Sequence, residues 1–433
     1  MPSIRLIAAN CPMRMLVLRD FFTLGDALYT VVTERITEQG AREALRSRGW
    51  NVTMHTMRVI RVVCRCALVA SLIATAVRSA PAQERGAAAM STANLAAKAG
   101  DEKQTADVAL EAHLREIAEA HHGKVALYAT QLNTGRSVGI DLDEVVQTAS
   151  VIKLTVLFEA MEQIREGKAH WDDKITLQTG DAVSGSGILL FLDAPQTLTL
   201  KDVLTLMIVM SDNTATNLAI DKIGLDAVNA RIAWMGLKDT HFYKKIGKPA
   251  MEAMPPDQAR YGLGKSTPRE MEQVMERIGL CQLEKPGDRD GPGAAKKTPI
   301  PQKDAAICGE AMKMLRGQFY RDTIPRYLEK LDATETGSGT ASKTGSLNAV
   351  RVDVAIVAGK TGPMVLSIFT YDNADTGWSA DNEGEVTIAK LARAIVDAWS
   401  PRGIDGKTLV PGLGMRPSVG ELISPKNGAA ASN

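Results

Sequence analysis

The sequence predicts an α/β sandwich in which both ends of the chain build one antiparallel sheet, flanked by helices. Three observations support this fold class: a helix and hairpin pattern precedes a mainly helical middle subdomain at about 141–335, and strands with a closing helix follow it. The chain has 433 residues, 45% of them hydrophobic and 23% charged. This composition is sufficient for a large buried core.

The first predicted elements are a helix and a hairpin. Apolar residues recur at helical spacing from Ala106 onward, and two alternating runs follow at Val125–Gln131 and Ser137–Ile140. The turn residues Asn133-Thr134-Gly135 separate these runs. We therefore expect the two runs to pair as neighbouring strands.

Helices dominate the predicted middle of the chain, and strands return after it. One helix is expected over 150–165, two helical segments are expected within 200–218 around Ser211, and Pro and Gly mark a breaker-rich insertion at 283–303. Strands and a last helix are then predicted at Ala341–Ser346, Val350–Ala358, Met364–Tyr371 and Val386–Trp399. The helical middle would therefore separate two groups of strands.

Residues 1–82 have the composition of a leader, with eleven Arg, no Lys and five acidic residues. Within 57–82, a basic start precedes an apolar run at 67–77 and then Ala80-Pro81-Ala82, the pattern of a cleaved signal peptide. An uncleaved anchor is the alternative, but the run is shorter than the ~20 residues of a bilayer span. We expect translation to start at Met57 and the product to be periplasmic or secreted, with no stable membrane span after cleavage.

The remaining ranges are expected to be a linker at 83–105, a catalytic domain at 106–400 and a loose tail at 401–433. The formal net charge of +1 argues against a nucleic-acid partner. Five cysteines without a CxxC pair and six histidines without HExxH give no metal motif, so no metal or cofactor is expected. Cys281 and Cys308 could pair in an exported body, and a monomer is expected.

Three short motifs stand in order along the expected domain: Ser150-Val151-Ile152-Lys153, Ser211-Asp212-Asn213 and Lys343-Thr344-Gly345. Together they resemble the signature of the serine β-lactamase and penicillin-binding-protein superfamily. The 61 residues between the first two motifs are close to the spacing of class A β-lactamases, and the insertion at 283–303 accounts for the longer second interval. The resemblance covers residues 106–399 and implies a β-lactamase-like fold.

The first motif carries the predicted nucleophile and base. Ser150 at the start of an apolar helix would lie where free backbone N–H groups favour developing negative charge. Lys153, three residues later, would lie on the same face within reach of the serine oxygen. A lysine that acts as a base must lose its proton, and burial beside another cation such as Lys343 would lower its pKa.

The second motif is predicted to transfer a proton and to hold the substrate. The Ser211 hydroxyl could donate a proton to the departing nitrogen of a cleaved amide. Asn213 could hold both a substrate amide and Lys153, because its side chain has a donor and an acceptor. Asp212 is expected to stabilise the loop by accepting backbone hydrogen bonds.

The third motif is predicted to bind a substrate carboxylate through Lys343 and Thr344, with Gly345 allowing a flat ligand to approach the backbone. The resemblance implies an oxyanion hole formed by the backbone N–H groups of Ser150 and Ser346. It also implies that Arg351 helps to hold the substrate carboxylate. An exposed charge at a strand edge is the alternative for Arg351.

The family's deacylating glutamate has no clear counterpart. Its place falls near Gly247 or Lys248, and Glu252 is the single carboxylate between Tyr243 and Pro255. The resemblance therefore implies a β-lactamase that opens the ring through a Ser150 acyl-enzyme. The alternatives are a D-Ala-D-Ala peptidase acting on a peptidoglycan-like substrate and a covalent penicillin-binding sensor with slow deacylation.

Overall fold

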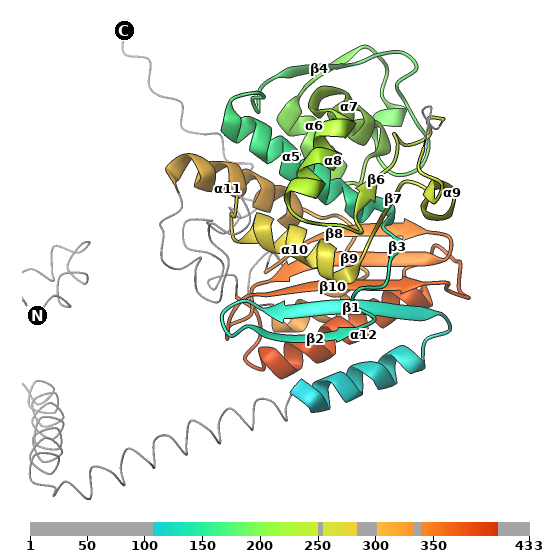
Figure 1. The fold of residues 1–433 in the computed structure, drawn as a ribbon, viewed down its shortest axis with the longest axis vertical. Coiled ribbons are helices and arrows are strands. Elements are labelled where there is room, and N and C mark those ends of the chain that lie inside the picture. The colour runs from blue at the N-terminus through green and yellow to red at the C-terminus, as the bar shows by residue number, and fades with distance from the viewer. Residues whose placement is uncertain (1–106, 250–253, 284–300, 333–338, 406–433) are drawn as a thin grey trace, which may run out of the picture. The chain divides into compact units, whose positions relative to one another are not determined.

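The computed structural model describes residues 107–249, 254–283, 301–332 and 339–405. Its central feature is a five-stranded sheet in the order β2-β1-β10-β9-β8, and every neighbouring pair is antiparallel (Figure 1). The strands are β1 (Lys124–Gln131), β2 (Arg136–Ile140), β8 (Thr340–Leu347), β9 (Val350–Val357) and β10 (Met364–Tyr371). The predicted fold class is therefore confirmed, and each of the five predicted strands agrees to within one residue.

The burial pattern of each strand agrees with its position in the sheet. Every residue of β9 is buried, as are seven of the eight residues of β10, which suits strands covered on both faces. β1 shows the partial alternation of a strand with one more exposed side. Among the described residues β8 is an edge strand, so one side of its backbone has no neighbouring strand.

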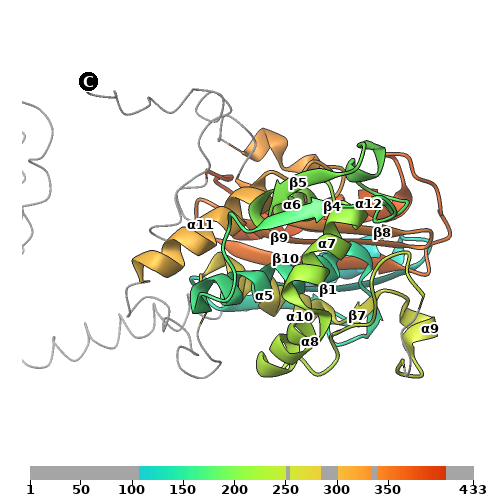
Figure 2. The ribbon, with the colours of Figure 1, turned by 90° about the horizontal axis from the view of Figure 1, so that it is seen from above.

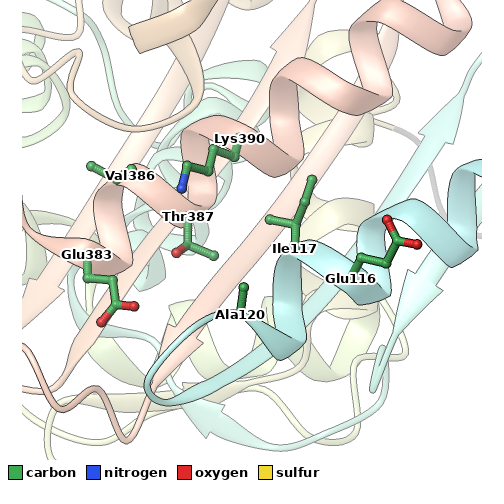
Figure 3. Close-up of a pocket in the computed structure, with 7 residues that line it drawn as sticks. All are labelled: Glu116, Ile117, Ala120, Glu383, Val386, Thr387 and Lys390. Atoms are coloured by element: carbon green, nitrogen blue, oxygen red, sulfur yellow. The ribbon is translucent and has the colours of Figure 1, made fainter.

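Helices cover both faces of the sheet. α10 (Pro268–Gly279) packs on β1, β9 and β10 from one face, and α12 (Glu383–Trp399) packs on β9 and β10 from the other, as Figure 2 shows. A helix at 107–119 and α12 lie toward the lower side of the sheet in Figure 1. The two lower helices lie side by side, and Figure 3 shows the crevice between them. The crevice is lined by Glu116, Ile117, Ala120, Glu383, Val386, Thr387 and Lys390. It lies across the sheet from the three motifs.

The mainly helical middle lies above the sheet in Figure 1, and Figure 2 shows it from a second side. Its helices are α5 (Lys153–Glu166), α6 (Leu200–Val209), α7 (Asn213–Ile223), α8 (Leu225–Trp234), α9 (Gln258–Tyr261) and α11 (Gln302–Arg316). Its 3-10 turns are η1 (Ala149–Ile152) and η2 (Leu189–Phe191). Its short strands are β3 (Val146–Gln147), β4 (Lys174–Leu177), β5 (Gln196–Thr199), β6 (His241–Phe242) and β7 (Gly264–Ser266). Two further turns, η4 (Ile324–Tyr327) and η5 (Glu329–Leu331), lie on the α12 side, where Arg393 of α12 donates to the Tyr327 carbonyl oxygen at 3.1 Å. No helix within the described ranges is long and apolar enough to cross a membrane.

Two predicted helices differ from the structure at their first residues. The helix expected from Ser150 begins as the 3-10 turn η1 and becomes α-helical only at Lys153. The last helix begins at Glu383 instead of Val386, because the side chain of Asn382 accepts hydrogen bonds from the N–H groups of Gly384 and Glu385.

A disulfide joins Cys281 to Cys308, which were open to pairing on the sequence alone. Cys281 follows α10 and Cys308 lies in α11, so the bond connects the ends of the segment that contains the predicted insertion. Residues 284–300 of that insertion lie outside the described ranges, as do the leader, the linker and most of the tail.

Candidate active site

Ser150 lies in η1, directly before α5. A 3-10 turn has three residues per turn, so Ser150 and Lys153 are aligned on one side. Ala149, immediately before, has a φ of 46°, which is unfavourable for a residue with a side chain. Ala149 is buried and Ser150 is half-buried. The turn therefore holds Ser150 at the boundary between the core and solvent.

Lys153 is fully buried, and its amine nitrogen lies within hydrogen-bond distance of three oxygens. The distances from Lys153 Nζ are 2.7 Å to the Ser211 carbonyl oxygen, 3.2 Å to Ser211 Oγ and 3.0 Å to Asn213 Oδ1. Ser150 Oγ is not among its hydrogen-bond partners in the described part of the chain. The second motif therefore positions Lys153. A hydrogen bond between a nucleophile and its base is often long before substrate binds.

Lys343 reaches the same hydroxyl from the edge strand. Lys343 Nζ is 3.0 Å from Ser211 Oγ and 2.6 Å from the Thr344 carbonyl oxygen, and the lysine side chain is fully buried. Ser211 has a φ of 53° and is 4% exposed. Its hydroxyl thus lies between two lysine amines, which brings all three motifs into one cluster.

Burial is the main cause of the lowered lysine pKa values in this cluster. Burial, and then the charge of Lys343, lower the pKa of Lys153 well below its ordinary value, while Asp212 opposes the shift. Burial lowers the pKa of Lys343 to about 7, and the carboxylate of Asp353 opposes that shift. The lowered pKa favours the neutral form of Lys153, which a base requires.

Gly345 allows the edge strand to approach the nucleophile's backbone. A Cβ atom on Gly345 would lie 2.8 Å from the Ser150 nitrogen and 2.9 Å from the Thr148 carbonyl oxygen. The contact with η1 gives Gly345 a structural reason that the sequence did not suggest, and its predicted role in admitting a flat ligand stays a prediction. The close approach brings Ser346, the next residue, near Ser150, as an oxyanion hole formed by their two N–H groups would need.

In the second motif, Asn213 contacts the lysine of the first motif and Asp212 binds backbone N–H groups. Asn213 Oδ1 accepts from Lys153, and Nδ2 donates to the Ser184 carbonyl oxygen at 3.0 Å. The Asp212 carboxylate accepts from the backbone N–H groups of Ile188, Leu189 and Ala215 at 2.7, 2.9 and 2.8 Å. Asp212 is 1% exposed, so it stabilises the loop, as expected.

Arg351 does not lie in the cleft, and the prediction that it contacts the substrate carboxylate needs correction. Arg351 pairs with Ser346 in the strand register, on the face of the sheet that is opposite Lys343. Its side chain is fully buried, and its Nε donates to Glu385 of α12 at 3.1 Å. Its other donors reach the carbonyl oxygens of Leu347, Val350 and Gly377. Four of the five N–H donors of the guanidinium group therefore bind the end of the sheet and α12.

Thr344 and Ser346 of β8 lie on the same face of the sheet as Arg351 of β9, and they flank the glycine that touches η1. Thr344 is 7% exposed and Ser346 is half-buried. Their position on the edge strand leaves them next to the cluster, but neither hydroxyl contacts a lysine amine in the described structure.

Two residues of the site were missed on the sequence. Asp353 is fully buried in β9, and its Oδ2 accepts from Thr323 Oγ1 at 2.7 Å and from the Ile324 N–H at 3.1 Å. Burial raises the pKa of Asp353 to about 6, against the effects of these hydrogen bonds and of Lys343. A single carboxylate within the apolar run of β9 was the available signal, because a buried charge needs partners.

The second missed residue is Asn217, one helical turn after Asn213 on α7. Asn217 Nδ2 donates to the Ile246 carbonyl oxygen and Asn217 Oδ1 accepts from the Ile246 N–H, both at 2.9 Å. These bonds attach the loop after β6 to the helix that carries Asn213. The spacing of four residues between Asn213 and Asn217 could have indicated this role, because it puts both side-chain amides on one face of the helix.

The loop after β6 was predicted to lack the family's glutamate. Its described residues 244–249 include three lysines and no carboxylate, and Asp257 further on binds Lys265 Nζ at 2.7 Å. Glu252, the other carboxylate considered, lies outside the described residues. Ile246, which Asn217 holds, is directly before Gly247, where the counted position of the glutamate falls.

An edge strand with a buried lysine, packed on a serine turn and on a second serine between two helices, defines the serine β-lactamase and penicillin-binding-protein class. A family model described as "Beta-lactamase enzyme family" matches residues 109–290 and 303–399. The chain belongs to this β-lactamase enzyme family and is class A-like.

Solved structures agree with this assignment. The β-lactamase from Sphaerobacter thermophilus DSM 20745 is 30% identical, with a TM-score of 0.54, and the match covers 67% of this chain and 97% of that one. PBP-A is 20% identical over 67% of this chain and 96% of its own, with a TM-score of 0.52. An ancestral class A β-lactamase is 20% identical over 67% and 99%, also with a TM-score of 0.52. The last two show the fold alone. No curated protein matches significantly.

Proposed function

We propose that this protein is a serine hydrolase that opens the β-lactam ring through an acyl-enzyme on Ser150. The observation that carries the proposal is the position of Ser211 Oγ, 3.2 Å from Lys153 Nζ and 3.0 Å from Lys343 Nζ. When both amines donate to it, the hydroxyl oxygen accepts two hydrogen bonds, and its own O–H remains available as a donor. A proton donor held in this way suits an amide bond whose nitrogen must leave.

The proposed acylation step transfers one proton overall. Neutral Lys153 accepts the proton of Ser150 Oγ while that oxygen attacks the ring carbonyl. The carbonyl oxygen gains negative charge, which the N–H groups of Ser150 and Ser346 stabilise. When the C–N bond breaks, Ser211 donates its proton to the ring nitrogen and takes the proton from Lys153. The products are an ester at Ser150 and a ring-opened amine.

A second candidate is a penicillin-binding protein whose acyl-enzyme persists. The observation that favours it is the attachment of Ile246 to Asn217, which holds an aliphatic residue close to the counted position of the deacylating glutamate. A point variant of PBP-A has been solved as an acyl-enzyme complex with penicillin G. For the present chain, slow hydrolysis of the ester would make it a D-Ala-D-Ala peptidase or a covalent sensor.

The test is one time course with two measurements. The mature protein is mixed with a chromogenic cephalosporin and with benzylpenicillin, and hydrolysis and intact mass are followed together. We expect a mass increase equal to one penicillin, located on Ser150, and no increase in Ser150→Ala. Rapid multiple turnover supports the β-lactamase, and a persistent adduct supports the second candidate. A Ser150→Ala variant that still forms the adduct or hydrolyses the cephalosporin overturns both.

We also propose that the protein acts as a monomer after export to the periplasm or beyond the cell, with cleavage after Ala82. The signal-like segment at 57–82 supports export. The disulfide also supports export, since such bonds persist in oxidising compartments. N-terminal sequencing of the exported protein tests the cleavage site, and light scattering tests the monomer.

A further inference from the structure

The loop after β6 carries positive charge that other parts of the described structure do not neutralise. Lys244, Lys245 and Lys248 are half-buried, and Lys245 forms an ion pair with Asp221. Lys244 Nζ donates to the Lys248 carbonyl oxygen at 3.3 Å. Neither Lys244 nor Lys248 has an acidic partner among the described residues. Within those residues, two cations are therefore left without a counter-charge.

The position of this loop is determined by α7. Asn217 holds the Ile246 backbone, and Asn213 lies one helical turn earlier on the same face, about 6 Å away by helix geometry. Gly247 packs on Val183, since a Cβ there would lie 3.3 Å from Val183 Cγ1. The next residue, Ser184, accepts a hydrogen bond from Asn213 through its carbonyl oxygen. The lysine loop thus runs along the Asn213 side of the site.

Asn213 is also the residue that would hold the acyl side of the substrate. Its amide nitrogen has two hydrogens, and one donates to Ser184. The second hydrogen is available for a carbonyl on the acyl side chain of a bound amide. The loop that contains Lys244 and Lys248 is attached to the same helix, one turn after Asn213.

We propose that Lys244 and Lys248 select acyl donors whose side chain carries a carboxylate. This inference rests on the proposed function, because it names a substrate class for the same site. Among the described residues, the two acids near this loop already have lysine partners, since Asp221 pairs with Lys245 and Asp257 with Lys265. An anionic β-lactam side chain and an acidic residue of a peptide ending in D-Ala-D-Ala share this chemistry.

The experiment compares two penicillins that differ in one carboxylate, one with a phenylacetyl side chain and one with an α-carboxyphenylacetyl side chain. Second-order acylation rates are measured by intact mass for the native protein and the Lys244→Gln/Lys248→Gln variant. We expect the ratio of anionic to neutral rates to be about five-fold higher in the native protein than in the variant. Salt at 1 M should remove most of that difference, because it shortens the Debye length to ~3 Å.

Lys390→Gln is the matched control, because Lys390 is an exposed lysine on α12, across the sheet from the site. It should retain the native ratio, and thermal melts should show that all variants fold. A second pair of substrates, D-Ala-D-Ala peptides with glutamyl or glutaminyl on the acyl side, shows which source of carboxylate is preferred. Equal ratios in the native protein and the double variant, for both pairs, overturn the inference. Absence of acylation by either penicillin would instead refute the proposed function.

Discussion

Lys343 Nζ donates a hydrogen bond to Ser211 Oγ at 3.0 Å, across 132 residues of sequence. The bond joins the edge strand of the sheet to the turn between two helices of the middle subdomain. Lys153 donates to the same oxygen, so the hydroxyl is shared by amines from both parts of the fold. The proposed acylation chemistry depends on this shared oxygen, and the following predictions test how it is held in place.

The pH dependence of acylation should reflect both lysines. Acylation needs neutral Lys153, whose pKa lies well below its usual value because of burial and of Lys343. Binding of a substrate carboxylate needs charged Lys343, whose pKa is lowered by burial to about 7. The second-order acylation rate should therefore rise with pH as Lys153 loses its proton, and fall above about pH 7 as Lys343 loses its own.

Lys343→Arg provides the control, because arginine keeps its charge far above neutral pH. We expect its alkaline limb to move upward by about one pH unit or more, whatever its peak rate. The measurement is the rate of adduct formation between pH 5 and 10. An alkaline limb at the same pH in both proteins would show that another group titrates there.

Gly345→Ala should disrupt the contact between β8 and η1. The added Cβ would lie 2.8 Å from the Ser150 nitrogen and 2.9 Å from the Thr148 carbonyl oxygen, both backbone atoms. We expect a loss of about 1–3 kcal/mol in the free energy of unfolding and a decrease in acylation rate of about 100-fold. Denaturant unfolding and adduct kinetics measure the two effects.

Gly309→Ala is the matched control, since Gly309 lies within α11 and an added Cβ would meet no atom of a packed neighbour within 4 Å. Alanine in a helix is more stable than glycine by roughly 0.5–1 kcal/mol. This variant should keep native acylation with equal or higher stability. The proposed contact would be wrong if Gly345→Ala acylated as fast as Gly309→Ala.

Arg351→Ala should affect stability much more than substrate binding. The guanidinium group is fully buried and binds Glu385 and three backbone carbonyl oxygens. Removing one partner of a buried pair costs about 3–5 kcal/mol. At a temperature where the variant is folded, we expect its acylation rate to remain within about three-fold of native. If Arg351→Ala kept native stability and its KM rose about ten-fold, Arg351 would be shown to bind the substrate carboxylate after all.

Asn217→Ala should free the loop after β6. It removes two hydrogen bonds to the Ile246 backbone, worth about 1–3 kcal/mol together. We expect faster hydrogen exchange at the Ile246 amide and a changed lifetime of the acyl-enzyme. Mass-detected exchange and adduct decay are the measurements.

Asn229→Ala is the control for this prediction because the geometry is matched. Asn229 of α8 donates to the Phe242 carbonyl oxygen at 2.9 Å and accepts from its N–H at 3.0 Å. The two variants should lose similar stability, but only Asn217→Ala should alter the acyl-enzyme. Equal adduct lifetimes in Asn217→Ala and Asn229→Ala would show that the loop after β6 does not affect deacylation.

The sequence predicted the elements well where a periodic pattern was strong. The hairpin at β1 and β2 and the strands β8 to β10 follow apolar patterns that local physics determines. The grouping of Ser150, Lys153, Ser211 and Lys343 was implied by the family resemblance that their three motifs carry. Arg351 shows the limit of this reasoning, because its contacts depend on the pairing of β8 with β9 and on which helix covers that face.

The roles of Gly345 and Asn217 were equally outside the reach of sequence patterns. Gly345 is needed because β8 approaches η1, a tertiary contact between residues almost 200 positions apart. The role of Asn217 depends on the path of an irregular loop, for which no periodicity exists. Local sequence patterns therefore predicted the helices and strands, whereas tertiary packing determined the contacts of individual side chains.

The disulfide between Cys281 and Cys308 has a consequence for the integrity of the site. Ser150, Lys153 and Ser211 precede the first cysteine, and Lys343 follows the second. A protease that cut the backbone anywhere between the two cysteines would therefore produce two fragments that stay covalently joined. The nicked protein would keep its nucleophile and its substrate-binding lysine in one molecule until a reductant separated them.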